Sequence, residues 1–174
     1  VKNGEITITK FNGNSTDVVI PAHIDRVPVR AIQSEAFMNN SVIQSVTIPG
    51  SIRTINPRAF YCCYGLTTVT LNEGLETIGG RAFSECPIRS IVIPDSVTEI
   101  ATIKSGTSYY GAFENCTALR TVVIGDGLSI IHRDTFHGCS SLETVTFGES
   151  LTSIYPYAFE DCDSLANICL TNKI

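Results

Sequence analysis

Cysteine is the residue type in this sequence with the most regular spacing and the widest choice of chemistry. Five of the seven cysteines follow an aromatic residue by three positions: Cys63, Cys86, Cys116, Cys139 and Cys162. A linear ladder of this kind does not give the tetrahedral convergence that zinc needs, although in-register neighbours about 5 Å apart could form disulfides. We predict that these five are small apolar residues of the core. Cys62 and Cys169 lie outside the ladder, and we expect them to be the exposed thiols.

The remaining polar residues show no pattern that is typical of catalysis or metal binding. The three histidines lie far apart, and we expect no shared site for them. Glu160, Asp161 and Asp163 lack the glycine and the ligand spacing of a calcium loop, so we interpret them as a solvated turn. No nucleophile–base pairing and no phosphate loop is present. We therefore predict that the protein is not an enzyme, with no catalytic residues, no cofactor and no metal.

The composition indicates a folded chain that binds neither nucleic acid nor membrane. The 174 residues are 43% hydrophobic and 17% charged, below the ~25% charged residues of a typical soluble domain. The formal net charge is -5 and there is no basic run, which argues against nucleic acid. No apolar stretch approaches the ~20 residues of a membrane span. The chain begins with Val1, and we expect a processed form or a module of a longer protein.

Phenylalanine marks an internal repeat. It occurs at positions 37, 60, 83, 113, 136 and 159, at intervals of 23, 23, 30, 23 and 23 residues. Alanine precedes five of these six residues. An apolar triplet follows at fixed spacing in each unit, for example Leu66, Val69 and Leu71, and then an apolar pair such as Leu75 and Ile78. Self-similarity at a period of 20–50 residues is the signature of a repeat architecture.

The spacing within one unit predicts its local structure. The last two residues of the triplet alternate with polar residues, as in a strand with one buried face. The Ala-Phe-x-x-Cys segment is too short for a regular helix, but it places its apolar residues on one side of about one helical turn. Since one unit cannot bury its own apolar residues, neighbours must stack. We predict an α/β solenoid of about six ~23-residue coils, with a parallel sheet on one face and short helical turns.

We expect a single domain over 1–174. Residues 1–31 would form an N-terminal cap, and residues 32–174 would form the repeats.

The unit Leu-x-x-Val-x-Ile-Pro-x-x-Val-x-x-Ile-x-x-x-Ala-Phe-x-x-Cys resembles the BspA-like leucine-rich repeats, also called the Treponema pallidum type. The resemblance covers essentially the whole chain. It implies a secreted or cell-surface protein, of bacteria or some protists, that functions in adhesion and protein–protein recognition, and it implies no catalytic residues.

Two surfaces are candidate binding sites. The outward residues of the triplet strands form a small, uncharged face, either a recognition surface or the ordinary preference of exposed strands. Its candidate residues are Thr47, Thr70, Thr121, Thr144 and Thr146. The second is an insertion of eleven residues, 101–111, where other units have three; it carries Lys104, Tyr109 and Tyr110. Loops on rigid scaffolds often carry function, although the insertion could also be a tolerated one whose tyrosines pack against the coil.

The sequence therefore predicts a non-catalytic module for protein recognition or adhesion, which we expect to be a monomer at the cell surface or outside the cell. The alternative is a structural spacer or an accessory module of an extracellular enzyme or of a polysaccharide-degrading assembly. A further alternative is direct carbohydrate binding by exposed tyrosines.

Overall fold

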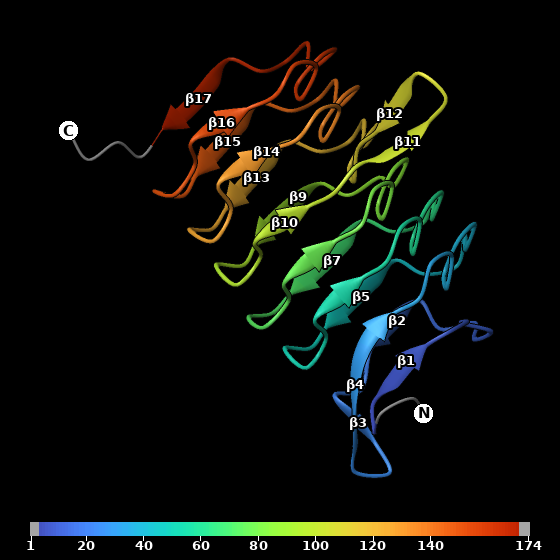
Figure 1. Ribbon diagram of the computed structural model, residues 1–174. Helices are drawn as coiled ribbons and strands as arrows, with labels where there is room; N and C mark the ends of the chain where they lie inside the picture. Colours follow the sequence, from blue (N-terminus) through green and yellow to red (C-terminus); the bar gives the residue numbers. More distant parts are fainter. Residues whose placement is uncertain (1–3, 171–174) are drawn as a thin grey trace.

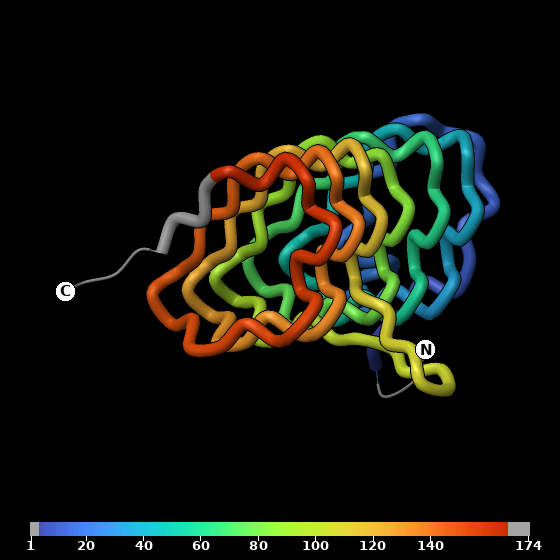
Figure 2. Tube along the Cα trace, turned by 90° about the horizontal axis from the view of Figure 1, so that it is seen from above, coloured from blue at the N-terminus to red at the C-terminus, as the bar shows by residue number. Residues whose placement is uncertain are grey.

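The computed structural model describes residues 4–170 and shows a stack of short coils, each made of strands joined by turns (Figures 1 and 2). One row of parallel strands contains the triplets: β2 (Asp17–Val19), β5 (Ser45–Ile48), β7 (Thr68–Leu71), β9 (Ser90–Ile93), β13 (Thr121–Ile124), β15 (Thr144–Phe147) and β17 (Asn167–Leu170). The row divides into β2-β5-β7 and β9-β13-β15-β17, and neighbours within each part pair in register, as Val46 with Val69 and Val122 with Val145. The predicted solenoid of about six coils with a parallel sheet is confirmed.

A second row of shorter strands contains the apolar pairs. Its members are β1 (Ile6–Ile8), β4 (Val27–Ile32), β6 (Thr54–Ile55), β8 (Thr77–Ile78), β10 (Glu99–Ile100), β14 (Ile130–Ile131) and β16 (Ser153–Ile154). Within the first 32 residues, β3 (His23–Ile24) pairs antiparallel with β4. The second row divides into β1-β4-β6-β8-β10 and β14-β16. The break falls after β10, where the insertion leaves the stack.

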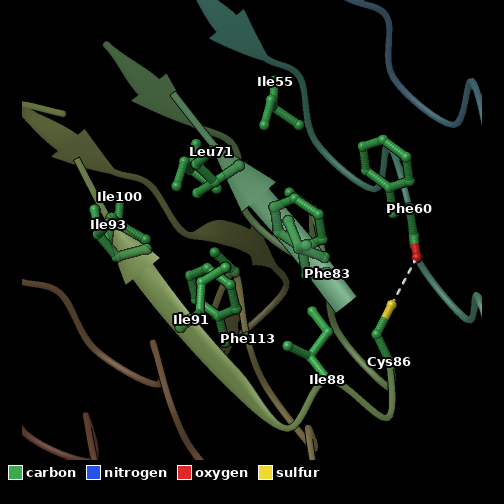
Figure 3. Close-up of a cluster of buried hydrophobic side chains, with 14 of the residues drawn as sticks. Ile55, Phe60, Leu71, Phe83, Cys86, Ile88, Ile91, Ile93, Ile100 and Phe113 are labelled. Carbon is green, nitrogen blue, oxygen red and sulfur yellow. Dashed lines mark hydrogen bonds between the residues drawn. The ribbon is translucent and has the colours of Figure 1, made fainter. Parts of the chain in front are cut away.

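The core between the two rows contains a column of phenylalanine rings. Phe37, Phe60, Phe83, Phe113, Phe136 and Phe159 stack face to face at centroid distances of 4.6–5.5 Å. Phe11 adds a seventh ring below Phe37, at 5.0 Å. Figure 3 shows Phe60, Phe83 and Phe113 in this column, beside the inward residues of the strands. Each interval between phenylalanines in the sequence thus corresponds to one coil of the stack.

The cysteine ladder lies in the core, as predicted. Each ladder thiol lies 3.0–3.2 Å from the carbonyl oxygen of the phenylalanine one coil earlier, so the S–H group can donate to it. The bond from Cys86 to Phe60 is drawn in Figure 3. Each of these carbonyls also accepts a backbone N–H from the residue three positions later, as that of Phe60 does from Cys63 at 3.2 Å, so the cysteine adds a second hydrogen bond to a buried acceptor. None of the six cysteines whose side chains are described forms a disulfide.

The prediction that Cys62 is an exposed thiol is wrong. Its residue is 5% exposed, because a positive φ of 57° turns the chain there and its thiol lies 3.8 Å from a carboxylate oxygen of Glu85. Cys169 lies in β17, outside the residues whose side chains the structure describes.

Thiol titration checks this arrangement. Burial raises the pKa of Cys116 to about 12 and that of Cys162 to about 11, and it also raises the pKa of Cys139. Since the thiolate is the reactive form, we expect at least five of the seven thiols to react with an aromatic disulfide reagent only after unfolding in denaturant. Three or more thiols reacting rapidly in the native protein would contradict the buried ladder.

The predicted short helical turns are absent from residues 4–170, so the fold is mainly β and the prediction of an α/β solenoid is wrong. In most units the residues two before and two after the phenylalanine have positive φ, as Arg81 (58°) and Glu85 (61°) do around Phe83. Left-handed residues cost ~1–2 kcal/mol each and interrupt a right-handed helix. The N–H of Phe83 instead donates to the carbonyl of Ala112 in the next coil, at 2.8 Å. Such bonds between coils alternate with turn bonds within the coil, such as the one from the N–H of Cys86 to the carbonyl of Phe83 at 3.2 Å, so the segment is not a continuous helix.

No helix in the described part of the chain is long and apolar enough to cross a membrane.

Candidate functional site

The insertion forms a β-hairpin that projects from the regular outline of the coils (Figure 2). Strands β11 (Ile103–Ser105) and β12 (Ser108–Tyr110) pair antiparallel, with Lys104 opposite Tyr109. The two-residue connection begins with Gly106, whose φ of 60° suits a tight hairpin turn. The extra residues of this unit therefore have a defined conformation on the scaffold.

Tyr110 fixes the hairpin to the preceding coil. The guanidinium of Arg81 lies 3.6 Å from the centroid of the Tyr110 ring, which is a close cation–π contact. The Nε atom of Arg81 also lies 3.3 Å from Oε2 of Glu114, and both side chains are largely buried, at 19% and 10% exposed. Tyr110 thus supports the hairpin from the side of the coil, which agrees with the alternative of a tyrosine packed against the scaffold.

Tyr109 faces the following coils and takes part in an arginine–aromatic stack. The guanidinium of Arg133 lies 5.3 Å from the centroid of Tyr109 and 4.7 Å from that of Tyr157, so it contacts both rings. The ammonium group of Lys104 lies 5.4 Å from the Tyr109 centroid. We call Lys104, Tyr109, Arg133 and Tyr157 the hairpin patch. It borders a hollow of about 250 Å³.

Among the described side chains Arg133 forms no ion pair, although its charge acts to lower the pKa of the adjacent Asp134. Two aromatic rings hold the guanidinium, and its N–H donors remain available. Since the side chain is already ordered by these rings, a partner that accepts hydrogen bonds from it incurs little further entropy loss.

A row of polar residues lies beneath the patch. Oε1 of Glu114 lies 3.9 Å from Nδ1 of His137, and Nε2 of His137 lies 3.7 Å from Glu160 and 3.4 Å from Asp161. Burial raises the pKa of Glu114 although Arg81 and His137 lower it, and burial also raises the pKa of Asp134. Burial thus disfavours the charged form of both carboxylates, and the neighbouring cations offset this effect in part.

The interpretation of Glu160 and Asp161 as a solvated turn holds for their exposure but misses their contact with His137. Glu114, His137 and Glu160 each follow the repeat phenylalanine by one residue, so their common position in the repeat predicts the row. Among the side chains that the structure describes, no group of histidine, cysteine, aspartate or glutamate is arranged to hold a metal ion.

The predicted threonine surface lies elsewhere. Thr47, Thr70, Thr121, Thr144 and Thr146 point outward from the first row of strands, half-buried or exposed, and none of them lines the hollow under the hairpin. The structure thus separates the candidate residues into two surfaces. Of the insertion residues, it places Lys104 and Tyr109 in the patch and Tyr110 against the scaffold. It adds Tyr157, one of the turn tyrosines expected to be able to extend an aromatic patch, and Arg133, which was not predicted for this site.

Stacked parallel strands with an apolar triplet in every coil define a leucine-rich-repeat solenoid. The chain belongs to the BspA-type leucine-rich repeat family, since the sequence profile of that repeat region, in six copies, matches residues 7–104 and 107–174. This confirms the resemblance found in the repeat unit.

Solved structures show the same fold. The leucine-rich repeat protein TpLRR of T. pallidum is 27% identical with a TM-score of 0.67, over 94% of this chain and 84% of that one. Leucine-rich repeat proteins from Bacteroides ovatus and Eubacterium ventriosum are 24% and 21% identical, with TM-scores of 0.62 and 0.66 over 97% and 89% of this chain. The chain spans about half of those two proteins, 49% and 48%. No curated protein matches it significantly.

Proposed function

We propose that this protein is a non-catalytic recognition module of a secreted or cell-surface protein, and that it binds a partner protein through the hairpin patch. Membership of the BspA-type family supports a binding role on a repeat scaffold. The observation that carries the proposal is the stack of Arg133 between Tyr109 and Tyr157. Tyrosine and arginine are, with tryptophan, the residues enriched among those that dominate binding energy at interfaces.

The surroundings of the stack support this role. On the hairpin Lys104 is exposed and Tyr109 is half-buried, and a partner can contact both without meeting the flat strands. The tyrosine rings offer apolar area at low entropic cost, and Arg133 offers its free donors. The threonine face, in contrast, has small uncharged side chains and no aromatic or arginine anchor.

Binding to a panel of immobilised extracellular-matrix and cell-surface proteins tests the proposal. We expect at least one panel protein to bind the wild-type chain, and Tyr109→Ala to weaken that binding about 30-fold, as for a residue worth ~2 kcal/mol. Tyr110 is left unchanged because it anchors the hairpin. The matched control is Tyr155→Ala, which removes a 46% exposed tyrosine outside the patch and is expected to bind as the wild type does.

A second variant tests the threonine face. Thr70→Arg combined with Thr121→Arg places two long charged side chains on that face, and we expect unchanged binding. Loss of binding in this variant, with Tyr109→Ala unaffected, would move the site to the strands. If no protein of the panel binds the wild-type chain, the recognition role is contradicted and the alternative of a structural spacer or accessory module is favoured.

A further inference from the structure

A hollow of about 460 Å³ lies where the turn between the ladder cysteine and the apolar triplet is one residue shorter than in the other units. Two residues separate the ladder cysteine from the apolar triplet in the other units, but Pro87 alone separates Cys86 from Ile88. In the neighbouring coils, the N–H groups of Tyr64 and Thr117 bond the carbonyl two residues earlier, at 3.0 and 2.9 Å. Proline has no N–H and cannot make this bond. The turn of this coil is therefore shorter than the turns on either side.

The walls of the hollow come from these three turns. Its lining consists of Tyr64, Glu85, Cys86, Pro87, Asn115 and Thr117, which we call the Tyr64 hollow. Backbone bonds between coils hold the lining in place. The backbone N–H of Glu85 donates to the carbonyl of Glu114 at 2.9 Å, and the backbone N–H of Asn115 donates to the carbonyl of His137 at 2.8 Å. A site that is already ordered loses little entropy when a ligand binds.

Tyr64 forms an exposed aromatic wall. It is 61% exposed, and its hydroxyl lies 3.5 Å from Oε2 of Glu85. The hydroxyl of Tyr61 lies 3.4 Å from Oε1 of the same carboxylate. Glu85 thus orients the ring of Tyr64 and accepts from two phenols; its Oε2 also faces the Cys62 thiol, while its Oε1 can accept a further hydrogen bond.

The chemistry of the lining selects among ligands. The hollow offers an aromatic face, a proline ring, a carboxylate, an amide and a hydroxyl, within the ~300–1,000 Å³ that is usual for ligand sites. A sugar ring has an apolar C–H face that can pack on Tyr64, and hydroxyls that can both donate and accept. The amide of Asn115 and the hydroxyl of Thr117 also do both. Glu85 is the one charged residue of this lining, and its charge is shared between two phenols, which favours a neutral ligand over a cation.

We propose that the Tyr64 hollow binds one or two residues of a neutral saccharide. This site goes beyond the proposed protein recognition and does not rest on it, because it shares no residue with the hairpin patch. A partner that carries a glycan could contact both surfaces, but each is tested separately.

Saturation-transfer difference NMR with neutral hexoses, N-acetylhexosamines and their disaccharides tests the site. We expect transfer to at least one of these sugars, and a loss of affinity of tenfold or more in Tyr64→Ala. The exposed position of Tyr64 allows the fold to survive this change, which thermal unfolding checks. Tyr155→Ala is the matched tyrosine control and should bind as the wild type does. Tyr109→Ala should also retain sugar binding, so that failure of the hairpin proposal and failure of this one are distinguishable.

A second variant tests the origin of the hollow. A glycine inserted between Pro87 and Ile88 restores the usual two-residue spacing of this turn without removing any lining residue, and we expect it to abolish sugar binding. Absence of transfer to every sugar would overturn the proposal. So would equal binding by Tyr64→Ala, or binding of a lysine-rich peptide in place of the sugars.

Discussion

Replacing Phe83 by alanine is expected to lower the free energy of unfolding by about 3–5 kcal/mol. Phe83 is fully buried in the middle of the column, with Phe60 at 5.2 Å and Phe113 at 5.5 Å between ring centroids. Alanine removes a whole ring and leaves a cavity that neighbours cannot fill, because backbone bonds on both sides fix the spacing of the coils. Urea unfolding followed by circular dichroism measures the loss.

Phe159→Ala is the matched control at the end of the column. Phe159 is half-buried and stacks on one ring of the column, Phe136. We expect Phe159→Ala to lower the free energy of unfolding by less than half as much as Phe83→Ala does. Equal costs for the two substitutions would contradict a column in which the central ring contributes most.

Replacing Arg81 by methionine is expected to cost about 2–3 kcal/mol at pH 7. The change leaves the largely buried carboxylate of Glu114 without its ion pair and removes the cation from the ring of Tyr110. Breaking a fully buried pair costs ~3–5 kcal/mol, and this pair is slightly exposed. Arg58→Met is the matched control at the same repeat position. Its pair with Glu35 is exposed and should contribute ~0–1 kcal/mol.

The cost of Arg81→Met should depend on pH. Arg81 lowers the pKa of Glu114, so its removal raises that pKa further above the ordinary value of 4.5. As the pH falls, Glu114 of the folded variant binds a proton at a higher pH than Glu114 of the unfolded chain does. The stability of the variant therefore rises as the pH falls through the raised pKa. We expect a smaller difference from the wild type at pH 4.5 than at pH 7. Adding Glu114→Gln should restore much of the stability at pH 7, and a cost independent of pH would contradict the role of the ion pair.

The period of the sequence was sufficient to predict the stack, the core and the ladder. Phe83, Cys86 and Ile91 are buried because their repeat positions face inward in every coil. The turns could not be predicted, since Ala-Phe-x-x-Cys also has the spacing of one helical turn. Arg81 and Glu85 are not glycine, and nothing in their type indicates a positive φ. Bonds to the next coil offset that cost, and they exist only in the assembled stack.

The location of the candidate site was predicted from the sequence, but the contacts of its side chains were not. An insertion with Lys104 and two adjacent tyrosines is visible in the sequence, but their opposite roles depend on the hairpin register. Tyr110 meets Arg81 of the preceding coil, whereas Tyr109 meets Arg133 of the following one. Such contacts between insertion and neighbouring coils follow from the three-dimensional path of the hairpin and not from the period.

Deletion of the hairpin tests the central claim most directly. Removing residues 103–110 leaves three residues between Ile100 and Ala112, the number found in the other units. We predict that the shortened chain retains a single cooperative unfolding transition and loses its binding to the panel protein that the intact chain recognises. A shortened chain that folds and still binds this protein with the affinity of the intact chain would contradict the claim that the hairpin patch is the recognition surface.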